Sequence, residues 1–341
     1  MSETDSGRPQ GALWGGFVAD AHAMPAHWYY DREALSRDYG RIVGYTAPKN
    51  PHPDSILWRS EYTPENERGQ ILHDQAEFWG KRDVHYHQNL VAGENTLNLQ
   101  LARVLLETLR DNDGYRPDDY LQRYIEFMLR PGSHRDTYVE EYHRNFFTNY
   151  ARGKKPRACG QSDIHIGGLA HVGVLAAFHH QDPALAREVV REHVGLTHPD
   201  PTLLRAADTL TRILIAVMDA MPLRQAIVKF GTDYFSEKRA QELVARPDDV
   251  AIGRIFSPAC YIQDAFPATL YLAWKYESSF AEGIIANTNV GGDNCHRGVV
   301  LGSLLGAAVG FDGIPANLIS GLTLREALNA ALPEQAAGAM A

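Results

Sequence analysis

The sequence predicts an all-α protein, and three observations carry that prediction. Leucine recurs every fourth residue at Leu97, Leu101 and Leu105, which places these side chains on one face of a helix. Two Asp-Pro pairs, at 182–183 and 200–201, precede long segments with helical spacing of apolar residues. Aspartate accepts hydrogen bonds from the free N–H groups of a first helical turn, and proline fits the first helical position. The chain contains no β-rich block and no alternation of strand and helix patterns.

Further helices are expected wherever apolar residues follow helical spacing. The expected segments are 11–23, a helix beginning at 96, 120–129, the stretches after residues 183 and 201, 236–245, 267–276, 280–286, and a last helix beginning near Arg297.

The last helix carries glycine at every fourth position, namely Gly298, Gly302, Gly306 and Gly310. These positions form a helix face without side chains, so the backbone of a neighbouring helix can approach closely. We expect that neighbour to be the helix that begins near Thr96. The apolar stretch 299–310 is shorter than the roughly 20 residues that a membrane helix needs. The pattern therefore predicts packing inside a core and no membrane contact.

The chain is expected to form one domain over residues 11–332. Residues 1–10 are polar and are predicted to be disordered, and residues 333–341 are predicted to be a flexible tail. Residues 40–92 are rich in Pro, Asn, His and aromatic residues and show no clean period. Long segments of this kind are usually functional or disordered. The aromatic residues favour an ordered excursion, with a short hairpin as one option.

Composition narrows the class of protein. The 341 residues carry a formal net charge of −9 and no long basic block, which argues against a nucleic-acid partner. Three widely separated cysteines form neither a disulfide framework nor a CxxC pair, as is typical of a reducing compartment. The polar N-terminal segment does not have the pattern of a signal peptide. We therefore expect a cytoplasmic protein, and the oligomeric state stays open.

Three segments differ from ordinary helix and core. Residues 291–298 (GGDNCHRG) and 93–98 (GENTLN) place polar residues at helix starts, where free N–H groups favour anions. Each of them also fits a simple helix cap. Residues 158–168 (ACGQSDIHIGG) combine small residues with polar ones and indicate a loop whose backbone approaches a ligand.

Together with the N-terminal segment, these motifs resemble the ADP-ribosylglycohydrolase family. The elements that carry the resemblance follow in the family's order, and they are 11–25 (GALWGGFVADAHAMP), 93–100 (GENTLNLQ), 159–169 (CGQSDIHIGGL), 196–201 (LTHPDP), 290–297 (VGGDNCHR), the glycine-rich helix after it and 313–315 (GIP). They cover nearly the whole chain outside residues 40–92. The resemblance implies an orthogonal bundle of helices whose loops meet in one central cleft, and an activity on ADP-ribosyl substrates.

The resemblance also implies a metal centre, which this sequence alters. The family holds two divalent ions, usually magnesium, through carboxylate and hydroxyl oxygens. The matching positions here are occupied by His27, Thr96, Leu97, Asn98, Asp293, Cys295 and His296. Because Leu97 cannot ligate and Asp293 is the one remaining carboxylate, we expect no magnesium pair. Thr96, Asn98 and Asp293 are residual candidates for a single weak ion. Cys295 and His296 with another histidine could hold a softer ion such as zinc.

The preferred hypothesis is a hydrolase that cleaves a glycosidic bond of an ADP-ribosyl or other nucleoside- or nucleotide-like substrate at a rebuilt site. Such cleavage needs a proton donor and a carboxylate. Asp293 is the expected carboxylate, with Glu94 in reserve, and His296 or His27 is the expected acid. We expect Asp20, Asn98, Asp293, Cys295 and His296 to line one cleft with His27 or His165. The expected substrate-binding residues are Asp20, His22, His27, Asn98, Gly160, Gln161, Ser162, Asp163, His165 and Asn294.

Two alternatives belong to other classes. In the first, Cys295 is a nucleophile whose pKa is lowered by the helix start and by His296 and Arg297. Its base would come from another segment, at His165, His27 or His22, since adjacent residues on a helix do not face each other. In the second, the chain is a non-catalytic relative that binds a ligand.

Overall fold

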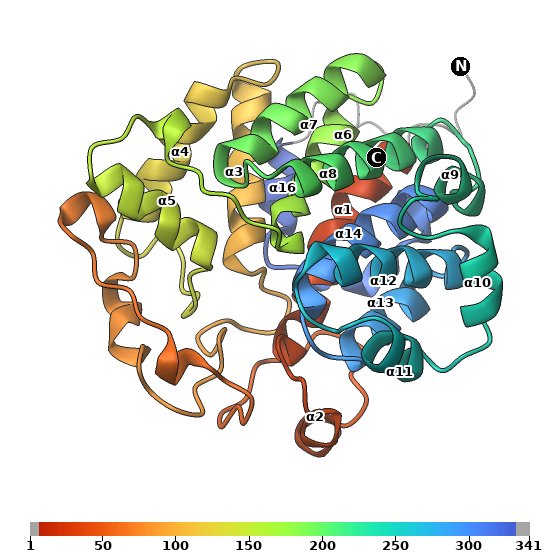
Figure 1. Ribbon diagram of the computed structural model, residues 1–341, viewed down its shortest axis with the longest axis horizontal. Helices are drawn as coiled ribbons and strands as arrows, with labels where there is room; N and C mark the ends of the chain where they lie inside the picture. Colours follow the sequence, from red (N-terminus) through yellow and green to blue (C-terminus); the bar gives the residue numbers. More distant parts are fainter. Residues whose placement is uncertain (1–6, 332–341) are drawn as a thin grey trace.

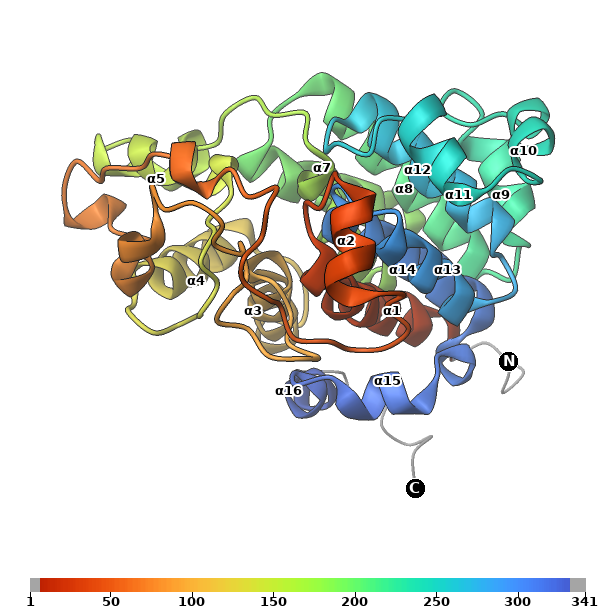
Figure 2. The ribbon, with the colours of Figure 1, turned by 90° about the horizontal axis from the view of Figure 1, so that it is seen from below.

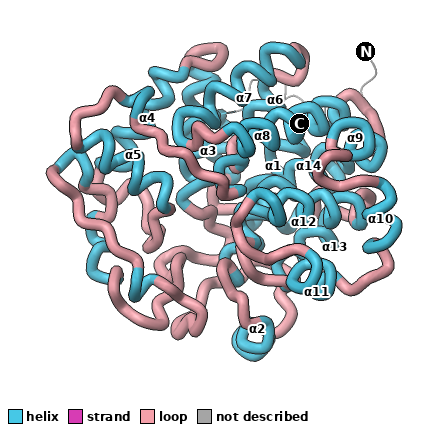
Figure 3. The backbone as a smooth tube through the Cα atoms, in the orientation of Figure 1, coloured by secondary structure: helices cyan, strands magenta, loops and turns pink. Residues whose placement is uncertain are grey.

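The computed structural model describes residues 7–331, and within this range the chain is helical, as predicted (Figure 3). It contains two isolated β-bridges there and no strand. The predicted disorder of residues 1–6 and the predicted tail at 333–341 lie outside the described residues. The prediction of disorder is wrong for residues 7–10, because the first helix already begins at Gly7.

The elements follow one another without interruption by a sheet (Figure 1). The α-helices are α1 (Gly7–Ala23), α2 (Arg32–Tyr39), α3 (Leu97–Asp111), α4 (Pro117–Leu129), α5 (Glu141–Ala151), α6 (Val172–Phe178), α7 (Pro183–Thr197), α8 (Pro201–Met218), α9 (Leu223–Phe230), α10 (Glu237–Leu243), α11 (Asp248–Val250), α12 (Ile262–Lys275), α13 (Phe280–Asn289), α14 (Asn294–Val309), α15 (Ala316–Gly321) and α16 (Arg325–Ala331).

Several helix starts follow from the local sequence. The Asp182 carboxylate accepts the N–H of Leu185, and the Asp200 carboxylate accepts the N–H of Thr202, so both Asp-Pro pairs cap helices as predicted. Helix α14 begins three residues before Arg297, and α12 begins five residues before Pro267. Pro267 therefore lies inside α12, where it removes the hydrogen bond that an N–H at this position would donate to the carbonyl oxygen of Gln263.

Helices α1 and α14 form the centre of the bundle and lie along each other (Figure 2). A Cβ added at Gly302 would lie 2.1 Å from the carbonyl oxygen of Gly15, and one at Gly306 would lie 2.0 Å from that of Gly11. The glycine face therefore packs tightly in a core, as predicted. Its neighbour is α1, so the prediction that α3 would be the neighbour is wrong.

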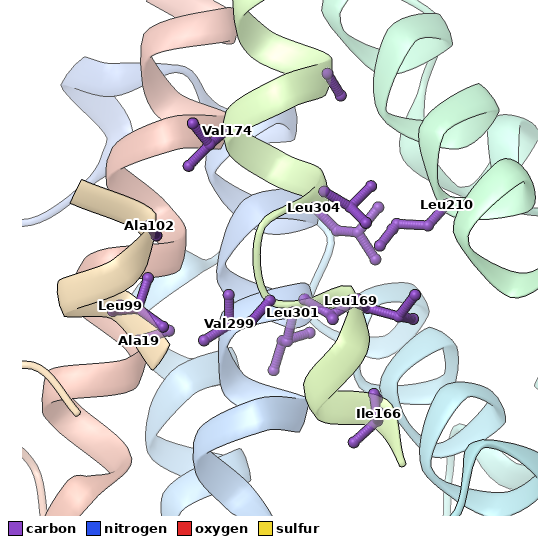
Figure 4. Close-up of a cluster of buried hydrophobic side chains, with 14 of the residues drawn as sticks. Ala19, Leu99, Ala102, Ile166, Leu169, Val174, Leu210, Val299, Leu301 and Leu304 are labelled. Carbon is purple, nitrogen blue, oxygen red and sulfur yellow. The ribbon is translucent and has the colours of Figure 1, made fainter. Parts of the chain in front are cut away.

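Apolar side chains from several helices surround this pair. Figure 4 shows Ala19 of α1, Leu99 of α3 and Val299 of α14 together at one end of a buried cluster. Leu304 of α14 and Leu210 of α8 continue the cluster on the other side. No described helix is long and apolar enough to cross a membrane.

Residues 40–92 form the ordered excursion that the aromatic residues predicted. It contains three short 3₁₀ helices, Leu57–Arg59, Glu67–Gly69 and His73–Phe78, and no hairpin. The buried imidazoles of His52 and His85 hold it against the segment after α1. Their Nε2 atoms lie 3.1 Å from the carbonyl oxygen of His27 and 3.0 Å from that of Pro25, respectively.

Candidate active site

A cavity of about 390 Å³ opens where the excursion, the start of α5 and the start of α14 meet. Its walls combine aromatic rings with carboxylates and imidazoles. The lining residues are Trp28, Tyr30, Asp54, Ile56, Arg59, Tyr86, Tyr138, Glu140, Glu141, Tyr142, Asp163, His165, Gly167, Cys260 and His296. Cavities of this size and character are where small molecules usually bind.

Trp28 forms the centre of the aromatic wall. Its backbone has a φ of 60°, a left-handed conformation that residues other than glycine rarely adopt, and its N–H donates to the carbonyl oxygen of Gly292 (2.8 Å). The indole packs edge to face against Tyr86 and Tyr138, with ring centroids 4.6 and 5.0 Å apart. An aromatic wall of this kind suits a nucleobase or a sugar face.

His296 forms part of the cavity floor at the first turn of α14. Its Nδ1 lies 2.7 Å from Asp293 Oδ1, and its Nε2 lies 2.6 Å from the side-chain amide of Asn98 and 3.5 Å from Glu140 Oε1. Burial opposes a charge on this imidazole, but Asp293 and Glu140 outweigh burial and raise the pKa of His296 to about 9.

Glu140 precedes α5 and occupies its N-cap position without capping it, so its side chain is free to face the cavity. The side chain is mostly buried, with 19% of its surface exposed. Burial raises the pKa of Glu140 to about 7, and His296 acts in the opposite direction. A carboxyl group of this kind can exchange a proton near neutral pH.

Asp163, His165 and Cys260 form a third group on the cavity wall. Asp163 Oδ1 accepts the backbone N–H of His165 (2.7 Å) and lies 2.9 Å from its Nδ1. Ile166 donates its N–H to the carbonyl oxygen of Cys260 (2.8 Å), which holds the two segments together. Burial raises the pKa of Asp163, but the bonds from His165 outweigh it, so the net shift is downward. The bond to Asp163, followed by the Cys260 thiol, raises the pKa of His165 to about 11.

A buried polar chain runs beneath the floor. Asp293 Oδ1 lies 3.0 Å from His27 Nε2, and His27 Nδ1 lies 2.6 Å from His87 Nε2. His87 Nδ1 in turn lies 2.5 Å from Asp136 Oδ1, and Asp136 Oδ2 accepts the N–H of Leu97 at the start of α3. The chain therefore ties the excursion to both motif helices.

The structure brings some of the sequence-predicted residues to the cavity and leaves others away from it. Asp163, His165 and His296 line it. Residues that are buried and do not line it are Asp20, His22, His27, Thr96, Asn98, Asp293, Asn294 and Cys295. The expectation that Asp20, Asn98, Asp293 and Cys295 line the cleft is therefore wrong, because neighbouring side chains cover them.

Several of these buried residues have other partners. Asp20 accepts the backbone N–H and the hydroxyl of Thr96 (2.9 and 2.8 Å), so it supports the start of α3. His22 Nδ1 lies 2.7 Å from the hydroxyl of Thr288, and Asn294 donates to the carbonyl oxygen of Thr288 (3.1 Å). They position helices and do not line the cavity.

Three residues of the predicted loop, Gly160, Gln161 and Ser162, make their contacts away from the cavity. A Cβ at Gly160 would lie 2.4 Å from the carbonyl oxygen of Leu196, so this glycine allows close packing of the chain. Gln161 is exposed, and Ser162 donates to Asp200 Oδ2 (2.8 Å) at the surface. None of the three lines the cavity.

The contacts of Glu94 do not support a catalytic role for this residue. Its carboxylate accepts the N–H of Val91 (2.9 Å) and pairs with Arg135 (2.5 Å), outside the cavity lining.

Cys295 does not have the environment of a nucleophile. The thiol is buried among Ala23, Met24 and Leu90. Burial, reinforced by the nearby Asp20 carboxylate, raises the pKa of Cys295 well above its ordinary value. The expected lowering of this pKa is wrong, because desolvation and acidic neighbours outweigh the helix start.

The analysis of the sequence missed Glu140, Tyr138, His87 and Asp136. Glu140 lies in an acidic pair before a helix, which resembles an ordinary helix start. The alternation of His85 and His87 within the excursion was the available signal, since two imidazoles two residues apart share one face of an extended chain.

The residues at the family's metal positions do not fit two magnesium ions. The hydroxyl of Thr96 donates to Asp20, and Asn98 Oδ1 accepts from the hydroxyl of Tyr142 (2.5 Å). Leu97 offers no oxygen, and Asp293 Oδ1 already meets two imidazoles. Magnesium requires a shell of oxygen ligands. The residues His27, Asp293 and His296, or His27, His87 and Cys295, do lie close enough to share one ion of another kind.

The fold and the cavity define an all-helical protein with a carboxylate- and histidine-lined site at its helix starts. A model of the ADP-ribosylglycohydrolase family matches residues 1–341. The chain therefore belongs to the ADP-ribosylglycohydrolase family.

One similar solved structure is described as an "ADP-ribosylglycohydrolase-related protein complex". It is 20% identical, covers 97% of this chain and 97% of its own, and superposes with a TM-score of 0.66. This likeness supports the fold. A comparison with curated proteins found no match to the chain.

Proposed function

We propose that this protein hydrolyses a glycosidic bond of an ADP-ribosyl or other nucleoside- or nucleotide-like substrate in the aromatic cavity. The single observation that carries the proposal is that Glu140 and Asp163 face one aromatic-walled cavity, as two of the four carboxyl side chains that line it. Glycoside cleavage needs one carboxyl group as proton donor and a second as an anion. Membership of a glycohydrolase family supports the same reaction class.

The environments of the two carboxyl groups suit different roles. Glu140 is enclosed by the cavity wall, which favours the neutral form that can donate a proton to the leaving group. Asp163 is held by two hydrogen bonds from His165, which favour its anion. The anion can direct water to the anomeric carbon and stabilise the positive charge that develops on the sugar. Trp28, Tyr86 and Tyr138 would hold the base or sugar.

Asp293, the carboxylate expected from the sequence, supports this site from beneath. It contacts His296, which in turn contacts Glu140. We assign Asp293 and His296 as positioning residues for the cavity floor. The Cys295 hypothesis is not pursued, because the thiol does not reach the cavity.

The test is product release by the full-length protein. ADP-ribosyl-arginine and a panel of nucleosides and nucleotides are incubated with it, and free base and ADP-ribose are quantified by chromatography. For any substrate that the wild type hydrolyses, Glu140→Gln should lower the rate of turnover by about 10²–10⁴-fold. The matched control is Glu237→Gln on the first turn of α10, which should be unaffected. Equal rates for wild type and Glu140→Gln would contradict the proposal, and binding without turnover would favour the ligand-binding alternative.

A further inference from the structure

One carboxylate oxygen beneath the cavity floor meets two imidazoles. His27 Nε2 lies 3.0 Å and His296 Nδ1 lies 2.7 Å from Asp293 Oδ1. All three side chains are buried. The other oxygen, Asp293 Oδ2, is also buried and has no hydrogen-bond partner among residues 7–331. A buried carboxylate oxygen without a partner is costly and indicates that a further group lies against it.

The hydrogen bonds behind His27 decide which of its nitrogens carries a hydrogen. His87 Nδ1 lies 2.5 Å from Asp136 Oδ1, so this nitrogen donates to the carboxylate. When His87 carries its single hydrogen at Nδ1, its Nε2 accepts the hydrogen of His27 Nδ1 at 2.6 Å. Neutral His27 therefore directs the lone pair of Nε2 at Asp293 Oδ1. Two acceptors at 3.0 Å repel each other unless a cation joins them.

His296 can present a lone pair to the same point. When a metal ion displaces the proton on Nδ1, the remaining hydrogen on Nε2 faces the Glu140 carboxyl group, 3.5 Å away, and Nδ1 offers its lone pair beside Asp293. The Asn98 amide, whose oxygen otherwise accepts from Tyr142, fits this arrangement after a half-turn that brings its oxygen to His296 Nε2. Its nitrogen then meets the hydroxyl of Tyr142 and an imidazole nitrogen of His143, both of which can accept.

We infer that His27, Asp293 and His296 bind one divalent transition-metal ion such as Zn²⁺. One ligand atom from each residue lies within 4.8 Å of the other two. Two ligand atoms on one zinc ion are about 3.3 Å apart, because its bonds are about 2.0–2.1 Å long. Small side-chain shifts therefore suffice. Two imidazoles and one carboxylate suit zinc and its neighbours, whereas magnesium selects oxygen ligands.

The surroundings match those of known metal sites. Histidines that bind metals usually donate their second ring N–H to a fixed acceptor, which sets the ring orientation. His87, itself held by Asp136, is that acceptor for His27. The His296 ring belongs to the cavity wall, so the ion lies just beneath the cavity. Binding of this ion does not depend on the proposed glycosidic activity.

A second ligand set shares His27. It combines His27 with His87 and Cys295, whose ligand atoms also lie within 4.8 Å of one another. Occupation of that set would break the short His27–His87 contact and would leave Asp293 Oδ2 without a partner. For this reason we favour the set that contains Asp293.

The test measures zinc binding by the full-length chain. Protein stripped with a chelator is titrated with Zn²⁺ against a chromophoric competitor, and bound metal is counted by mass spectrometry. We expect one ion per chain, and Co²⁺ substitution should give d–d absorption bands of a nitrogen- and oxygen-ligated ion. His296→Gln and Asp293→Asn should each weaken binding by at least about tenfold, and so should His87→Gln, which loosens the outer partner. Melting curves establish that each variant is folded.

Two control variants distinguish the ligand set that contains Asp293 from the set that contains Cys295. His165→Gln removes an imidazole from the same cavity and should leave zinc affinity unchanged, as should Cys295→Ser. Loss of binding in Cys295→Ser with normal binding in His296→Gln would overturn the proposed ligand set. Failure of the wild-type protein to bind any zinc, cobalt or iron ion stoichiometrically would overturn the site itself. Stoichiometric uptake of two magnesium ions in its place would also overturn it.

Discussion

His87 Nε2 lies 2.6 Å from His27 Nδ1, and the two imidazole rings are parallel to within 2°. The pair joins the excursion to the segment after α1 and is buried. Because it connects Asp136 to Asp293, a change at either end alters the hydrogen bonding of the whole chain of residues.

Asp293→Asn should impair the protein more than Cys295→Ala. The substitution removes a fully buried charge that two imidazoles contact, and loss of one partner from such a network costs about 3 kcal/mol. Activity should fall with it, because His296 loses the contact that orients it. Cys295→Ala removes one buried sulfur and should cost about 1 kcal/mol. Urea unfolding and turnover of the two variants, measured side by side, check this order. An active, stable Asp293→Asn protein would refute it.

Gly302→Ala should destabilise the chain strongly. The new Cβ would lie 2.1 Å from the carbonyl oxygen of Gly15, so α1 and α14 must move apart, at a cost of about 3 kcal/mol. Gly195→Ala in α7 is the matched control, because a Cβ there has no neighbour within 4 Å. Alanine is the better helix former by about 0.5–1 kcal/mol, so the control should be slightly more stable than wild type. Thermal melting of both variants is the measurement, and equal effects would contradict the packing described for α14.

The ion pair of His165 and Asp163 should make stability depend on pH. The folded-state pKa of His165, about 11, exceeds its unfolded value of about 6.5, so the protonated imidazole stabilises the fold. This contribution is complete below about pH 6.5 and is lost as the pH rises toward 11. Asp163 behaves in the opposite sense, because its lowered pKa gives a contribution that is lost in acid. The stability difference between wild type and His165→Gln should therefore shrink from pH 6 to pH 10. A constant difference over this range would show that the pair is not coupled to folding.

Thiol labelling of the native protein should select Cys260. It lines the cavity, whereas Cys159 and Cys295 are buried. Burial raises the pKa of Cys260, so alkylation should be slow at pH 7 and faster at pH 9. Peptide mapping by mass spectrometry after iodoacetamide treatment checks the site, with Cys260→Ser as the control that abolishes labelling. Labelling of Cys295 at the same rate would show that the floor of the cavity opens.

The helical architecture was predictable because its signals are local. A few residues close together in the sequence indicate the helix caps at Asp182 and Asp200 and the glycine face at Gly302 and Gly306. The local sequence does not indicate which helix packs against that face. Glycines at Gly11 and Gly15 complement it, yet the pairing of two glycine faces emerges only once both helices are placed.

The candidate site was predictable only in part. His296, Asp163 and His165 belong to short motifs and do line the cavity. The orientation of Asp293, by contrast, depends on His27 from a distant segment as well as on the neighbouring His296. Glu140 has no motif of its own, and its role follows from the cavity that residues 40–92 close around it. Burial of this kind depends on tertiary packing, which the pattern of a single segment does not encode.

The anchoring of the excursion by His52 and His85 has a consequence for protein engineering. Residues 40–92 resemble a surface insertion that could be shortened, yet these two imidazoles bond to the backbone of Pro25 and His27, directly before Trp28. A truncated chain would keep its central helix pair while losing the cavity. Libraries aimed at new substrates should therefore vary the exposed Trp58 and Arg59 of this segment and leave its buried histidines untouched.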